Sequence, residues 1–137
     1  MRSLEYQHAE AAVTSALDAA DNLDVHVCAA VVDAGGHLLA FRRQDGSSRV
    51  SINMAINKAF TAAMLEMATA DLGPLTQPAA PLFGLETAER GRIVSFGGGV
   101  PVFVDGGSLG AVGVSGGTVD QDVRIAEAGA EAAAALG

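Results

Sequence analysis

The sequence predicts a single α+β domain, and three observations lead to this fold class. The chain has 137 residues, which is the size of one typical domain. Two pairs of short apolar segments are each joined by adjacent glycines, which is the pattern of β-hairpins. Three longer segments carry apolar residues at helical spacing. Hairpins, rather than alternating strand–helix–strand units, indicate a mainly antiparallel sheet with helices packed against it.

The first half of the chain is expected to form a helix, a hairpin and a second helix. These elements are a helix over 4–20, strands over 25–32 and 37–42, and a helix over 51–66. The first helix is amphipathic, with acidic residues opposite its apolar face. The glycine pair at 35–36 supplies the positive φ that a tight turn between two strands requires.

The second half is expected to contain an irregular segment, three strands and a last helix. These elements are a loop with one short helical turn over 69–91, strands over 92–96, 102–105 and 108–114, and a helix that follows Thr118. Prolines interrupt the first of these segments, which favours a loop. Thr118 and Gln121 have the spacing of a capping box, which marks the start of a helix.

Composition excludes several classes of partner. There are 16 acidic against 8 basic residues, giving a net charge of −8, so binding to nucleic acid or to an anionic membrane surface is not expected. No apolar run approaches the ~20 residues of a spanning helix, and the N-terminus lacks the apolar stretch of a secretory signal. The single cysteine, Cys28, excludes an internal disulfide. We therefore expect a cytoplasmic protein.

The chain is also unusually apolar. Half of its residues are hydrophobic and only 18% are charged, below the ~25% of an average domain. A protein of this composition often covers part of its surface in an assembly, so we expect a homo-oligomer.

The glycines suggest where a ligand would bind. Gly97, Gly98 and Gly99 form one cluster and Gly116 and Gly117 a second, ahead of the last helix. Glycines let a ligand approach the backbone closely, and N–H groups before a helix can hold an anion. The structural alternative is that these glycines only let strands twist and pack. No nucleotide phosphate-binding motif is present.

Three further side chains are candidates for this site. Lys58 is the only lysine and lies among apolar or small residues, where it would bind a carboxylate or act as a base, unless it is a surface residue with its amine in water. Arg42 would face the ligand if it points inward from its strand, the alternative being a solvated edge. Asp33 is a candidate acid–base residue, the alternative being that it caps the turn that follows it.

Histidines and cysteine give little indication of a metal site. His8, His26 and His37 lack the spacing of a helical metal pair, so no metal site is expected. One imidazole is nevertheless sufficient as an axial ligand of haem. Cys28 lies in an apolar strand, where thiols are usually buried and inert.

Taken together, several segments resemble the GlcG/HbpS family, which includes haem-binding proteins and the C-terminal domain of PduO-type proteins. They are residues 30–43, residues 57–62 (Asn-Lys-Ala-Phe-Thr-Ala), residues 97–101 (Gly-Gly-Gly-Val-Pro) and residues 110–117. The resemblance extends over nearly the whole chain, so residues 1–137 are expected to be one GlcG/HbpS-like domain.

The resemblance implies a profilin-like α/β/α sandwich with a five-stranded antiparallel sheet, assembled into dimers or larger oligomers. It implies haem as a cofactor of some members. An axial histidine on the first helix of those members makes His8 the candidate ligand, although His8 lies nearer the helix start than the usual position.

Two main functions are compatible with these observations. The first is a small oligomeric protein that binds an anionic small molecule such as haem or a carboxylate metabolite, through Lys58, Arg42 and the glycine clusters. The second is a cofactor-independent isomerase, lyase or hydratase that acts on a small carboxylate or carbonyl compound by acid–base catalysis at Lys58 or Asp33. A third role, as an assembly partner that only stabilises another protein, also stays open.

Overall fold

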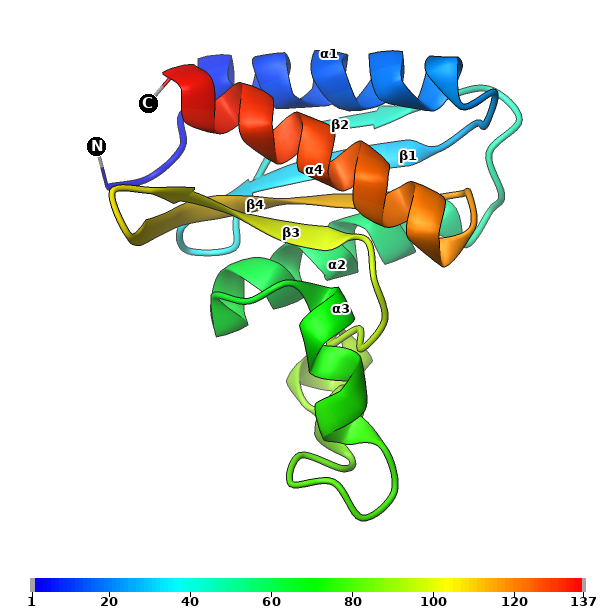
Figure 1. Ribbon diagram of the computed structural model, residues 1–137, viewed down its shortest axis with the longest axis vertical. Helices are drawn as coiled ribbons and strands as arrows, with labels where there is room; N and C mark the ends of the chain where they lie inside the picture. Colours follow the sequence, from blue (N-terminus) through cyan, green and yellow to red (C-terminus); the bar gives the residue numbers. More distant parts are fainter. Residues whose placement is uncertain (1, 137) are drawn as a thin grey trace.

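A four-stranded antiparallel sheet organises the residues that the computed structural model describes, 2–136 (Figure 1). The strands are β1 (Cys28–Asp33), β2 (Leu38–Arg43), β3 (Gly99–Val104) and β4 (Gly107–Ser115). Their order across the sheet is β2-β1-β4-β3, so two hairpins lie side by side with β1 and β4 in the centre. The α+β class predicted from the sequence is confirmed.

Helices cover both faces of this sheet. Figure 1 shows α1 (Tyr6–Asn22) and α4 (Val119–Leu136) on one face and α2 (Ser51–Leu65) on the other. The side chains of β1 alternate accordingly, as strand geometry requires. Ala29 and Val31 belong to the core beneath α1 and α4, whereas Ala30 and Val32 belong to the core beneath α2.

Helix α2 packs unusually close to the sheet because β4 has a glycine beneath it. A Cβ atom on Gly113 would collide with the backbone oxygen of Ala55 and lie 2.5 Å from the backbone nitrogen of Ala59. Real Cβ atoms do not approach backbone so closely, so the helix could not occupy this position over any larger residue. Gly113 therefore sets the distance between α2 and β4.

Residues 73–91 form a projection that we call the arm. It follows the short helix α3 (Thr69–Leu72) and contains three 3-10 turns, η1 (Gly73–Thr76), η2 (Leu85–Thr87) and η3 (Glu89–Gly91). Figure 1 shows it extending away from the sheet, below α2. The expected irregular segment over 69–91 is present, but it contains α3 and three 3-10 turns rather than one short helical turn.

The prediction of five strands was wrong, because residues 92–96 are not a strand. Ile93 and Val94 are buried, as the apolar pattern indicated. However, the Val94 N–H donates to Oγ1 of Thr61 at 3.0 Å, and the Thr61 hydroxyl lies 3.3 Å from the Arg92 carbonyl. This segment is therefore held by a side chain of α2 rather than by a neighbouring strand. The profilin-like part of the expectation stays a prediction.

The remaining elements agree with the sequence to within a few residues. The capping box at the start of α4 is present, since the Thr118 N–H donates to Oε1 of Gln121 at 2.9 Å and the Gln121 N–H donates to Oγ1 of Thr118 at 3.2 Å. Between residues 2 and 136, none of the helices combines the length and apolarity needed to span a bilayer.

Candidate functional site

Lys58 lies inside the protein, at the end of the sheet where β4 leads into α4. Its side chain is essentially inaccessible to solvent, although α2 places it only two turns from the helix start. Nζ donates to the Val114 carbonyl at 3.0 Å and to Oδ2 of Asp122 at 3.2 Å. The ring of Phe96 covers it, with its centroid 4.9 Å from Nζ. The ammonium thus has a carbonyl, a carboxylate and an aromatic face around it.

Asp122 is the counterion that the sequence did not single out. It lies in the first turns of α4, where the helix dipole favours a negative charge. Its Oδ1 accepts the Gly117 N–H at 2.8 Å, while Oδ2 faces Lys58. The carboxylate therefore ties the glycine turn before α4 to the middle of α2.

Burial and mutual attraction act in opposite directions on this pair. Burial lowers the pKa of Lys58, and the attraction and hydrogen bond of Asp122 partly offset that effect. Burial likewise raises the pKa of Asp122, against the influence of Lys58 and of the Gly117 N–H. Both shifts have the sign of desolvation, which penalises a charged group removed from water.

The predicted glycines do gather around Lys58, and the structure gives a packing reason for several of them. A Cβ atom on Gly98 would lie 2.6 Å from Nζ of Lys58, and one on Gly99 would collide with the Lys58 carbonyl. A Cβ atom on Gly97 would meet the Val123 side chain at 2.5 Å. These glycines make room for the lysine and for α2, which is the structural alternative named above.

The second cluster packs in the same way. A Cβ atom on Gly116 would lie 2.5 Å from the His26 carbonyl, and one on Gly117 would lie 2.9 Å from Oε1 of Gln121. The Gly117 N–H, which could have held an external anion, is already used by Asp122. An internal carboxylate thus occupies the position expected for a ligand.

Arg42 is not part of this cluster. Nη2 of Arg42 donates to Oε2 of Glu10 on α1 at 2.9 Å, and both side chains are about half exposed. Its strand partner Ala29 faces the α1 side of the sheet, whereas Lys58 approaches from α2. The sheet therefore separates the two cations that the sequence placed in one pocket.

Asp33 caps the hairpin turn, as the alternative interpretation held. Its Oδ1 accepts the N–H groups of Gly35 and His37, each at 2.9 Å. The same oxygen lies 3.4 Å from Nδ1 of His37, whose side chain is 82% exposed. The carboxylate thus orients the imidazole so that Nδ1 faces Asp33.

His8 is buried and forms part of the start of α1. Its Nδ1 accepts the Glu5 N–H at 3.0 Å, which completes a capping box. A ring nitrogen that accepts a hydrogen bond is unprotonated, so Nε2 carries the proton of the neutral imidazole. An iron ligand must present an unprotonated nitrogen. The unprotonated nitrogen of His8, Nδ1, already accepts the hydrogen bond that caps the helix.

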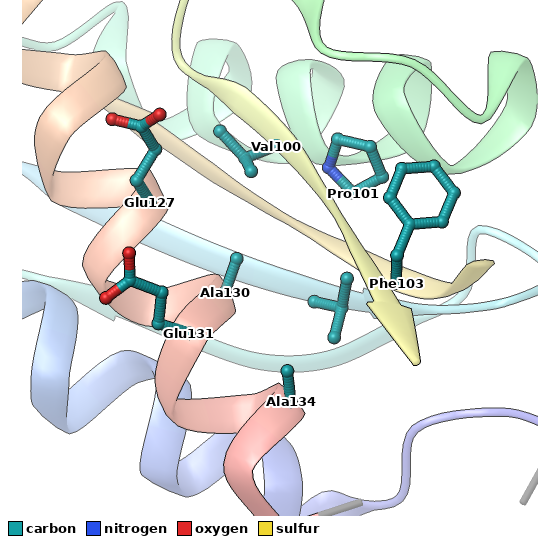
Figure 2. Close-up of a pocket in the computed structure, with 8 residues that line it drawn as sticks. Val100, Pro101, Phe103, Glu127, Ala130, Glu131 and Ala134 are labelled. Carbon is teal, nitrogen blue, oxygen red and sulfur yellow. The ribbon is translucent and has the colours of Figure 1, made fainter. Parts of the chain in front are cut away.

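Two surface hollows differ in the charge that they present. One, of about 370 Å³, is lined by Glu89, Arg90 and Arg92 at the base of the arm. The other, of about 280 Å³, lies between β3 and α4, where Figure 2 shows Glu127 and Glu131 on the helix side facing the apolar side chains of the strand. Only the first offers cations to an anionic ligand.

The sequence offered Asp122 only as one of several unranked acidic residues, and it did not indicate Arg90 or Arg92 as site residues. A lone lysine within an apolar helix implies a buried counterion, which would have ranked the acidic residues. Nothing comparable marks the two arginines, since they lie in an irregular segment. In the part of the chain from 2 to 136, no cluster of three or more His, Cys, Asp or Glu side chains is placed to hold a metal ion.

Comparison with known proteins identifies the family. A family model described as "Haem degrading protein HbpS-like" matches residues 4–131. The chain belongs to the HbpS-like family. The resemblance to GlcG/HbpS proteins noted from the motifs is thereby confirmed.

HbpS-like relatives match over most of the chain. An uncharacterised 15.0 kDa protein of Citrobacter freundii is 46% identical over 105 residues, which are 77% of this chain and 74% of the relative. Protein GlcG of Escherichia coli K12 is 36% identical over 112 residues, covering 82% and 81%. The corrinoid adenosyltransferase PduO of C. freundii is 39% identical over 125 residues, but this chain, 91% of which is matched, spans only 37% of that protein.

Solved structures of HbpS-like proteins show the same fold. The Klebsiella pneumoniae protein ORFY has a TM-score of 0.96 at 34% identity, over 100% of this chain and 94% of its own. A structure described as a PduOC–haem complex has a TM-score of 0.90 at 36% identity, over 95% and 94%.

Proposed function

We propose that this protein is a small ligand-binding protein that takes up haem. The observation that supports the proposal is its likeness, over almost the whole chain, to the haem complex of the PduO domain. The family description, which names haem, points the same way. The ligand is anionic, as the sequence suggested, because haem carries two propionates.

The three imidazoles differ in their fitness to hold an iron. His8 is buried, and its unprotonated nitrogen caps α1. His37 has the arrangement common to metal-binding histidines, in which one ring nitrogen faces a carboxylate and the other faces outward. His26 is exposed. The donor chemistry therefore fits haem best at His37, and we propose His37 rather than His8 as the residue that holds the iron.

An absorbance titration with haemin tests both parts of this proposal. Wild-type protein is expected to give a sharp, saturable Soret band, and His37→Ala is expected to shift or abolish it. His26→Ala and His8→Ala are the matched controls and are expected to retain the band. Broad, non-saturating absorbance of the wild type would overturn haem binding. A band lost only in His8→Ala would restore the sequence-based assignment.

Self-association belongs to the same proposal. The arm carries Leu82 and Phe83, which are neighbours in the chain and are 40% and 66% exposed. Exposed apolar side chains of this size are typical of surfaces that other proteins cover. We propose a homo-oligomer in the cytoplasm. A sedimentation mass near 13.8 kDa at micromolar concentration would contradict the assembly.

The acid–base enzyme is less well supported by the same geometry. Phe96 covers Lys58, and the amine is bound to Val114 and Asp122. A substrate would have to displace both the ring and the carboxylate to reach Nζ. Asp33, for its part, has its Oδ1 occupied by the turn. Binding without turnover therefore describes the site better.

A further inference from the structure

We propose that the hollow lined by Glu89, Arg90 and Arg92 is a binding site for a carboxylate group. It is a different place from the Lys58 cluster, where an internal carboxylate already satisfies the cation. Its volume is about 370 Å³, which is ample for a carboxylate with a short chain attached. No feature of the Lys58 cluster or of the imidazoles is needed for this inference.

The guanidinium of Arg92 is held in place before any ligand arrives. Its Cζ lies 3.7 Å from the centroid of the Phe60 ring, and its Nε reaches Oδ1 of Asn57 at 3.5 Å. Stacking on an aromatic face fixes the plane of the guanidinium. Because these contacts use the flat face and Nε, the two terminal nitrogens are left to form the paired hydrogen bonds that a carboxylate accepts.

The cations of the hollow are also unneutralised. Across residues 2–136 the ion pairs join His37 to Asp33, Arg42 to Glu10 and Lys58 to Asp122. Neither Arg90 nor Arg92 takes part in any of them. Glu89 lines the same hollow but forms no ion pair with either arginine, so the hollow has positive charge left over for an anion from outside.

The backbone of the hollow is strained in a way that displays Arg90. Glu89, Arg90 and Gly91 have successive φ values of 52°, 59° and 79°. The left-handed region costs about 1–2 kcal/mol for a residue with a side chain. The turn is closed by hydrogen bonds from the Gly91 N–H to the Ala88 carbonyl at 3.0 Å and from the Arg92 N–H to the Glu89 carbonyl at 3.2 Å. Strain of this kind concentrates at binding sites.

Charge selects the class of anion. Two guanidiniums and the Glu89 carboxylate give the lining a net charge of about +1, so a single carboxylate balances it. The hollow is therefore expected to accept one carboxylate, with Glu89 available to any hydrogen-bond donor on the same ligand.

The carboxylate has two sources, a propionate of haem or a free small carboxylic acid. Only the first source rests on the proposed function. It is geometrically reasonable, because a Cβ atom on Gly36 would touch the Phe60 ring at 3.1 Å and Arg92 stacks on the same ring. The turn that carries His37 and the hollow therefore both lie against Phe60.

The test compares three ligands across matched arginine variants. Succinate is titrated by NMR, and haemin and haemin dimethyl ester by absorbance, against wild type, Arg90→Gln, Arg92→Gln and the control Arg42→Gln. We expect Arg90→Gln and Arg92→Gln to weaken succinate or haemin at least tenfold, and Arg42→Gln to change neither by more than twofold. If Arg92→Gln unfolds, the exposed Arg90→Gln alone decides the result.

Each outcome has one meaning. Loss of succinate binding in the variants identifies a free acid as the source. Loss of haemin binding, with the dimethyl ester unaffected, identifies a propionate. The site is overturned if neither ligand is weakened, or if Arg42→Gln weakens them equally through general charge. If succinate binding is also unchanged, haemin binding that persists in all variants would overturn the hollow and leave haem binding intact.

Discussion

Lys58 and Asp122 form an ion pair that is almost completely removed from solvent. Each would be costly to bury alone, because the effective penalty for taking one ion out of water is several kcal/mol. Together, and with the Val114 carbonyl and the Gly117 N–H, their polar atoms are satisfied. Each residue of the pair therefore depends on the other to remain buried in the core.

Asp122→Asn is expected to destabilise the protein by about 3–5 kcal/mol at pH 7, because a buried ammonium loses its counterion. The attraction and the hydrogen bond of Asp122 both raise the pKa of Lys58, so without them this pKa falls further below its ordinary value of 10.5. Between the lowered pKa and 10.5, the folded variant binds fewer protons than the unfolded chain, so the stability of the variant rises with pH.

Thermal unfolding from pH 7 to pH 10 measures this effect. The difference in Tm between wild type and Asp122→Asn should narrow as pH rises. Asp120→Asn, an exposed neighbour in the same helix turn, is the matched control and should leave Tm within about 1 °C at both pH values. A difference that stays constant or widens with pH would mean that Lys58 keeps its proton in the folded variant.

Composition alone indicated that Lys58 is unusual, but not what it contacts. A single lysine among alanines can be recognised in a sequence, whereas its partner lies 64 residues away and depends on how two hairpins are arranged. Arg42 illustrates the same limit. Its strand was predicted correctly, yet the face that it occupies was not, because alternation fixes relative and not absolute orientation.

Among the elements, α2 and β4 pack closely because Gly113 has no Cβ atom. Gly113→Ala is expected to lower the free energy of unfolding by about 1–3 kcal/mol, because the added methyl must push α2 away from the sheet. Gly107→Ala is the control in the same strand, since its Cβ would have its nearest neighbour at 3.7 Å. That variant should change stability by less than about 0.5 kcal/mol.

Urea unfolding of both variants gives the comparison. Equal effects of the two substitutions would show that strand glycines act here through chain flexibility, and not through the approach of α2.

Element types were predictable wherever local chemistry decided them. The glycine turns, the capping box at Thr118 and the alternating strands are local, and all are present. Residues 92–96 were mistaken for a strand because their apolar pattern reports burial and not the hydrogen-bond partner. The hydroxyl of Thr61, some 30 residues earlier, supplies that partner.

For the whole molecule, the arm presents a large apolar side chain to solvent. Phe83 is 66% exposed near its tip. If the arm mediates self-association, Leu82→Asp/Phe83→Asp should lower the sedimentation mass toward 13.8 kDa, because desolvating the new carboxylates would oppose the contact. Phe103→Asp on β3 is the control. A fall with Phe103→Asp alone would move the interface to the strand edge.

The order of events in folding follows from the Lys58–Asp122 contact. Its partners come from α2 and α4, so it closes the longest loop of any side-chain ion pair described here, and it can form only after both helices have docked on opposite faces of the sheet. A contact made that late is absent from the transition state. Asp122→Asn should therefore leave the refolding rate almost unchanged and accelerate unfolding by roughly 150- to 5,000-fold, as stopped-flow measurements would show. By this account the buried pair acts as a latch: it governs how long the folded protein lasts rather than how quickly it forms.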